Sequence, residues 1–170
     1  MLVLRDVVVP VDFESTSYQA LRYARDLAGT FGARLHLLHV LEDVFALPAG
    51  TEGPLSAFPQ LARRAEDDAR ERLNGLLAED DKASAVIAVV ISSSPATAIA
   101  SYAEQNQASV IVMGTQGRLA KPLGAIGSVA EHVLRTAPCP VLILRRHPQE
   151  TAVSAEPPPA HSSVAAKRPA

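Results

Sequence analysis

Four glycines lie close together in the second half of the chain and lead into a serine. Gly114, Gly117, Gly124 and Gly127 fall within fourteen residues, out of nine glycines in the whole chain, and Ser128 follows directly. Glycine lets a backbone approach an anion closely and turn its N–H groups inward. Ser128 stands where a helix is expected to begin, and a helix N-terminus adds N–H donors and a partial positive charge. This segment therefore predicts a phosphate-binding cradle, with simple turn chemistry as the alternative.

The glycine segment does not follow the two best-known nucleotide-binding patterns. A Walker A loop is excluded because no glycine is followed by Lys-Ser or Lys-Thr, and GxGxxG does not occur. The first strand-to-helix turn, from Asp12 to Ser15, has no glycine, which disfavours a nicotinamide or flavin dinucleotide. The Asp12 carboxylate suits ribose hydroxyls or an adenine amino group better than phosphate. We expect base and sugar near Asp12 and phosphates near the glycines; alternatively, Asp12 only caps the following helix.

The residues that could catalyse a reaction form no convincing set. Phosphoryl transfer needs a positioned acceptor, usually a metal, and a group that stabilises the developing charge. His39 lies within an expected strand and is predicted to be a buried structural residue. Cys139, between two prolines, is predicted to be structural, with redox sensing as the alternative. One cysteine cannot form an intrachain disulfide, and the five histidines lack the spacing of zinc ligands. We predict binding without a catalytic residue or metal site; a slow ATPase that uses the same pocket is the alternative.

Five short apolar runs, rich in β-branched residues, alternate with longer segments of helical periodicity. Apolar runs of this length are typical of strands that are buried on both faces. The strands are expected at Val7–Val11, Leu35–Leu41, Ala85–Ile91, Val110–Met113 and Val141–Leu144. The helices are expected at 15–29, with Ser15 or Thr16 as its cap, at 59–79, and from Pro95 and Ser128 onward.

This alternation predicts an α/β fold, an open five-stranded parallel sheet with helices on both faces. We expect the Rossmann-like strand order 3-2-1-4-5, although periodicity alone does not give a strand order. In such sheets ligands bind at the carboxyl ends of the strands where the order reverses, here between the first and fourth strands. The turn at Asp12 and the segment from Gly114 would then face one crevice.

At these residues the sequence resembles a known family. Gly114, Gly117, Gly127 and Ser128 fit the pattern G-x2-G-x9-G-[ST] of ATP-binding universal stress proteins. The resemblance runs from about Arg5 to Arg145 and includes Val9–Phe13, His39-Val40, Val129–Glu131 and Ala137–Leu142. The strand order given above is also that of the family, so it is not independent of the resemblance.

The resemblance implies an adenine-nucleotide-binding protein of the stress response that binds ATP, with or without Mg²⁺. Adenosine would lie at the first and second strands, and the ribose and phosphates at the glycine segment and the start of the last helix. The implied binding residues are Pro10, Val11, Asp12, Val40, Met113, Gly114, Gly117, Gly127, Ser128 and Val129. The family commonly dimerises through its last strand, so a homodimer through Val141–Leu144 is also implied.

The composition sets wider limits on partners and domains. The net charge of −2 and the low aromatic content argue against a nucleic-acid partner, and no apolar run is long enough to cross a membrane. A cytoplasmic protein is therefore expected. We expect one nucleotide-binding domain at residues 1–147 and a disordered tail rich in proline and alanine at 148–170. Residues Glu42–Phe58 read as a long surface loop; this loop or the tail could bind a partner in a nucleotide-independent interaction module.

Overall fold

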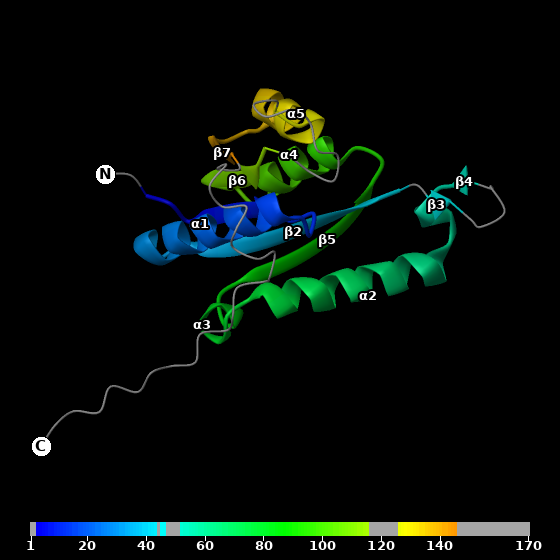
Figure 1. The fold of residues 1–170 in the computed structure, drawn as a ribbon, viewed down its shortest axis with the longest axis horizontal. Helices are drawn as coiled ribbons and strands as arrows, with labels where there is room; N and C mark the ends of the chain where they lie inside the picture. Colours follow the sequence, from blue (N-terminus) through cyan, green and yellow to red (C-terminus); the bar gives the residue numbers. More distant parts are fainter. Residues whose placement is uncertain (1–2, 44, 47–51, 116–125, 146–170) are drawn as a thin grey trace, which may run out of the picture.

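A computed structural model describes residues 3–43, 45–46, 52–115 and 126–145. Its centre is a five-stranded parallel sheet in the order β5-β2-β1-β6-β7 (Figure 1). The strands are β1 (Asp6–Pro10), β2 (Arg34–Glu42), β5 (Val86–Ser92), β6 (Val110–Gly114) and β7 (Val141–Leu144). Numbered along the chain, these five strands run 3-2-1-4-5 across the sheet, which confirms the expected topology.

Helices cover both faces of the sheet, as expected. They are α1 (Ser15–Phe31), α2 (Pro59–Leu76), the short α3 (Glu79–Lys82), α4 (Pro95–Gln105) and α5 (Ser128–Thr136). Figure 1 shows α2 on the opposite side of the sheet from α4 and α5. Successive strand residues point to opposite faces, so Val7 and Val9 pack with α1 and α2 whereas Val8 packs with α4 and α5. Each face therefore has its own hydrophobic core.

The first strand begins one residue earlier than predicted, at Asp6, and this carboxylate is buried. A buried charge needs partners, and Asp6 Oδ1 accepts hydrogen bonds from Arg34 Nε at 2.8 Å and His36 Nε2 at 2.9 Å. Apolar patterning could not find such a residue, because its burial depends on side chains from the neighbouring strand β2.

The second helix ends earlier than predicted. Periodicity predicts a helix to Glu79, but α2 stops at Leu76, Leu77 is extended, and α3 is a separate turn of helix. Arg25 of α1 holds this end in place. Its Nη2 donates to the Leu76 carbonyl at 2.8 Å and its Nε lies 2.5 Å from Asp81 Oδ2. The Leu76 carbonyl at the end of α2 thus gains a hydrogen bond from a side chain of α1, a tertiary contact that the local sequence does not encode.

The segment predicted as a loop from Glu42 to Phe58 is partly regular, so that prediction was incomplete. β2 runs through Glu42, and β3 (Phe45–Ala46) pairs antiparallel with β4 (Glu52–Gly53) before a 3-10 turn at Leu55–Ala57. The intervening residues 47–51 lie outside the described part of the chain. So does the predicted tail at 148–170, and the domain boundary expected after residue 147 stays a prediction.

Candidate nucleotide-binding site

The strand order reverses between β1 and β6, and a pocket lies at the carboxyl ends of these strands. β1 pairs with β2 on one side and with β6 on the other. The pocket has a volume of about 520 Å³ and also takes residues from β2 and from the first turns of α1, α4 and α5. Pockets of roughly 300–1,000 Å³ suit small organic ligands. Its place follows from the topology, because every strand-to-helix connection in a parallel sheet starts at this edge.

The pocket brings together nine of the ten residues predicted to bind a nucleotide. They are Pro10, Val11, Asp12, Val40, Met113, Gly114, Gly127, Ser128 and Val129. The tenth, Gly117, lies outside the described residues. The expected crevice is therefore present, and the contact of these residues with a ligand stays a prediction.

A close approach between β6 and α1 shapes one wall of the pocket. A Cβ atom on Gly114 would lie 2.8 Å from Thr16 Cβ and 2.9 Å from the Thr16 carbonyl oxygen. Both distances are shorter than real Cβ atoms tolerate, so only glycine fits here. Thr115 follows Gly114 in this wall. Its N–H donates to the Leu144 carbonyl at 2.9 Å, and its carbonyl accepts from the Gly127 N–H at 2.6 Å. These bonds fix the start of α5 against the end of β6.

The N-terminus of α5 forms another wall. Gly127 is the N-cap residue, with ordinary dihedral angles (φ −66°, ψ 151°) and no side-chain capping bond. Gly127, Ser128, Val129 and Ala130 all line the pocket, and Ser128 and Val129 are exposed. Amides in the first turn of a helix have no partner within it, and the helix dipole makes this end positive. This wall can therefore bind an anion such as phosphate, assisted by the Ser128 hydroxyl.

The turn after β1 carries Asp12 and has an unusual conformation. Asp12 Oδ1 accepts a hydrogen bond from the Glu14 N–H at 3.0 Å, and Phe13 between them has φ +63°. α1 then begins at Ser15 with Glu14 as its N-cap residue and no side-chain capping bond, so the caps expected at Asp12, Ser15 or Thr16 were wrong. Asp12 instead closes a turn onto the residue two positions ahead. Its carboxylate belongs to the pocket lining.

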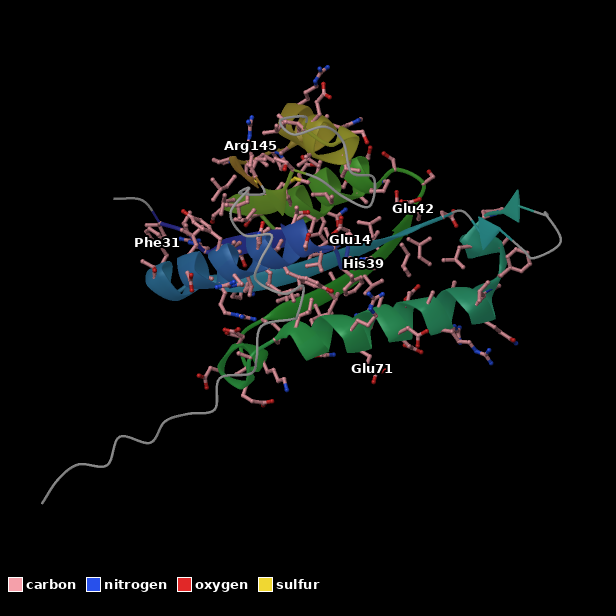
Figure 2. All side chains as sticks on the ribbon, in the orientation of Figure 1. Glu14, Phe31, His39, Glu42, Glu71 and Arg145 are labelled. Carbon is pink, nitrogen blue, oxygen red and sulfur yellow. The ribbon has the colours of Figure 1, made fainter. Side chains whose placement is uncertain are left out.

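The end of β2 completes the pocket with residues of two kinds. Val40 is half-buried and packs on the α4 and α5 side of the sheet. His39 is buried, and its ring contacts the Phe13 ring on the α1 and α2 side. His39 Nδ1 donates to the Val11 carbonyl at 2.6 Å, so it holds the β1 turn. Figure 2 labels His39 and Glu14, which come from the two segments joined here. The buried, structural His39 predicted from the sequence is present, but it also lines the pocket.

Charge is divided across the pocket. Among the described lining residues the charged side chains are Asp12 and Glu42, both at the β1 and β2 side, and neither lysine nor arginine is present. The opposite side carries the positive N-terminus of α5. Carboxylates accept hydrogen bonds from hydroxyl and amino groups, and helix N-termini attract anions. The pocket can thus take a ligand that is neutral and polar at one end and anionic at the other.

Several lining residues were missed from the sequence. Thr16 and Ser17 come from the first turn of α1, and Pro95 and Ile99 come from α4. The topology held a signal for them, because in a parallel α/β sheet the helix N-termini gather at the same edge as the ligand. Glu42 extends β2 by one residue beyond its predicted end, and Thr115 directly follows β6. No motif marks either residue.

The described residues contain neither a cluster of metal-ligating side chains nor a membrane-spanning helix. Within ranges 3–43, 45–46, 52–115 and 126–145, no three His, Cys, Asp or Glu side chains gather in a way that could hold a metal ion. Over those ranges too, no helix is both long and apolar enough to cross a bilayer.

The chain is similar in sequence and in fold to known proteins. The family profile described as "Universal stress protein family" matches residues 4–145. Universal stress protein MJ0531 of Methanocaldococcus jannaschii is 28% identical over 148 residues, which span 86% of this chain and 85% of that protein. The structure of universal stress protein UspA from Lactobacillus plantarum has a TM-score of 0.64 and 25% identity, and covers 85% of this chain and all of that one.

A further solved structure was obtained with a nucleotide. The universal stress protein from Archaeoglobus fulgidus in complex with dAMP has a TM-score of 0.52 and 22% identity, and covers 84% of this chain and 98% of that one. At this identity the likeness concerns the fold. The profile, by contrast, matches well over half of the chain from end to end of the sheet, and this chain therefore belongs to the universal stress protein family.

Proposed function

We propose that this protein is a regulatory protein of the stress response that binds an adenine nucleotide, ATP in cells, and acts by binding rather than by turnover. The observation that carries the proposal is the division of the pocket at the β1/β6 switch point. Carboxylates lie at one side and the amide-rich start of α5 at the other. A nucleotide has the same division, a neutral base and sugar joined to anionic phosphates.

The residues at each side suit the part of the nucleotide assigned to them. Asp12 offers acceptors for ribose hydroxyls or the adenine amino group, and Val40 offers an apolar surface and backbone groups for the base. Gly127 and Ser128 would hold phosphate, and Mg²⁺ bound to the phosphates would offset their charge, because the described lining has no cationic side chain. The dAMP complex of the Archaeoglobus fulgidus protein supports an adenine nucleotide as the ligand of such a fold.

The affinity needed is modest. Cellular ATP is of millimolar order, so a useful site requires about −4 kcal/mol. A few charge-assisted hydrogen bonds, each worth about 1.5–3 kcal/mol, suffice for that. Turnover asks for more, namely a base near the phosphates. Among the described lining residues the histidine is His39. Its Nδ1 donates to the Val11 carbonyl and its ring packs on Phe13, on the side of the pocket away from the start of α5.

A homodimer through β7 also belongs to the proposal. Within the described residues β7 pairs only with β6, and its four apolar residues are half-buried. An open edge of this kind can pair with the same strand of a second copy. Sedimentation velocity of the whole chain tests this: a monomer at micromolar concentration, with and without ATP, would contradict it.

The experiment that tests the binding site is a calorimetric titration with Mg-ATP. Gly127→Glu is the test variant, because its backbone angles suit any residue and the new carboxylate would stand in the phosphate cradle. Gly75→Glu in α2 is the matched control, since a Cβ there meets nothing within 4 Å and Gly75 is not a pocket residue. We expect the parent and the control to bind equally and Gly127→Glu to bind at least about tenfold more weakly, a loss of about 1.4 kcal/mol.

The outcomes separate the candidate functions. If a folded, nucleotide-free parent binds neither ATP nor another adenine nucleotide, the proposal fails and a nucleotide-independent interaction module is favoured. If the parent binds and also releases phosphate well above the rate without protein, the slow ATPase is favoured. Equal binding by Gly127→Glu would show that the ligand lies elsewhere.

A further inference from the structure

The turn that carries Asp12 has a backbone conformation that its sequence does not favour. Phe13 has φ +63°, in the left-handed region that an aromatic residue rarely adopts. Such a conformation persists only where surrounding contacts hold it, and it is found preferentially at functional sites.

Two side chains from other elements contact the Phe13 ring. The Arg72 guanidinium of α2 lies over the ring, with Cζ 3.6 Å from the ring centroid. The His39 ring of β2 is tilted against it, with centroids 4.6 Å apart. A cation over an aromatic face within about 6 Å is attracted by the ring quadrupole. Arg72 itself is exposed and is not one of the residues that line the pocket.

These contacts hold both neighbours of Asp12. His39 Nδ1 donates to the Val11 carbonyl at 2.6 Å, which fixes the residue before Asp12, and the His39 and Arg72 contacts fix the residue after it. Asp12 in turn closes the turn through its bond to the Glu14 N–H at 3.0 Å. The direction of the Asp12 carboxylate in the pocket therefore depends on where the Phe13 ring is held.

We propose that Arg72 is a positioning residue for the adenosine half of the site: by packing on Phe13, α2 sets the orientation of Asp12 and so the affinity for the nucleoside. This inference rests on the proposed function, and it makes binding dependent on a helix that supplies none of the described pocket residues. Any change that draws the Arg72 side chain away from Phe13 would weaken adenosine binding while leaving the phosphate cradle at α5 intact.

The test compares Arg72→Ala with Arg70→Ala, another exposed arginine two residues earlier on α2. Calorimetry measures affinity for adenosine, for Mg-ATP and for inorganic triphosphate. We expect Arg72→Ala to weaken adenosine and Mg-ATP by the same factor, about three- to tenfold, and to leave triphosphate unchanged. Arg70→Ala should change none of them. General damage to the fold would lower all three affinities and would overturn the proposal.

A double-mutant cycle with Phe13 shows whether Arg72 acts through that ring. Phe13→Gly removes the ring but adopts φ +63° without strain, so its loss should be smaller than that of Phe13→Ala, which keeps the strain and loses the contacts. In either background the additional effect of Arg72→Ala should disappear. An Arg72 effect of full size without the ring would overturn the proposal.

A second readout needs no nucleotide. Amide hydrogen exchange at Glu14, whose N–H bonds to Asp12 Oδ1, should become faster in Arg72→Ala and stay unchanged in Arg70→Ala. If the parent binds no nucleotide, the proposed function fails, and faster exchange at Glu14 still supports the positioning of Asp12 by Arg72. Unchanged exchange at Glu14 in Arg72→Ala would overturn this inference whatever the ligand.

Discussion

The carboxylate of Asp6 shows how one residue can set the pH dependence of the fold. It is buried at the start of β1, and Arg34 and His36 both donate to its Oδ1. Burial alone would raise the pKa of Asp6, but these hydrogen bonds, with the charge of Arg34, outweigh burial and lower it. His36 Nδ1 lies 3.0 Å from the Tyr102 hydroxyl, so the group links β1, β2 and α4. Burial, and then the Asp6 charge, raise the pKa of Tyr102.

We predict that Asp6→Asn lowers the free energy of unfolding by about 1–3 kcal/mol at neutral pH. Because the folded-state pKa of Asp6 lies below its unfolded value, its contribution is full above the ordinary value of 3.8 and is lost as the pH falls through the folded value. The difference between parent and variant should therefore shrink below about pH 4. Urea unfolding at several pH values measures it, with the exposed Asp26→Asn as the control. A difference that stays constant with pH would contradict the assigned cause.

The sequence predicted the pocket residues whose role depends on backbone shape. Gly114 and Gly127 stand out because glycine is required for a close approach or tolerated at a helix start. Asp6 and Phe13 could not be predicted in the same way. Burial of Asp6 and the left-handed Phe13 both arise from side chains distant in sequence, Arg34 and His36 in one case and His39 and Arg72 in the other.

At the element scale, the contact between β6 and α1 fixes the pocket wall. We predict that Gly114→Ala destabilises the protein by about 1–3 kcal/mol, because the new methyl group would overlap Thr16 side-chain and backbone atoms. Gly29→Ala in α1 is the matched control: a Cβ there meets nothing within 4 Å, and replacing a helical glycine should stabilise by about 0.5–1 kcal/mol. Thermal unfolding of both variants tests the pair, and equal effects would show that the close approach is not rigid.

Sequence periodicity predicted the elements well where they are long and apolar. The five strands of the large sheet lie within a residue or two of their expected bounds, and β7 matches at both ends. The two-residue strands β3 and β4 were missed because pieces so short carry no periodicity. The strand order came from the family resemblance, since the order depends on which strands pair and not on the pattern within any of them.

In the whole molecule, the way the pocket is built couples ligand binding to folding. Its lining comes from β1, β2 and β6 and from the starts of α1, α4 and α5, so no part of the chain can form it before the sheet is assembled. A nucleotide that binds only the folded state then stabilises the entire domain. At a ligand concentration of 100 times Kd, the gain in the free energy of unfolding is about 2.7 kcal/mol.

We therefore predict that Mg-ATP at that ratio raises the Tm by about 5–10 °C, since about 1 kcal/mol shifts a domain of this size by roughly 2–4 °C. The rise should grow with the logarithm of ATP concentration, because each tenfold increase beyond saturation adds about 1.4 kcal/mol. MgCl₂ alone should give no comparable rise. Gly127→Glu, with a Kd at least about tenfold higher, should lose about half of the shift or more, while Gly75→Glu keeps it. A shift that is the same in Gly127→Glu and the parent would mean that ATP stabilises the fold from outside this pocket, and the site at the start of α5 would have to be abandoned.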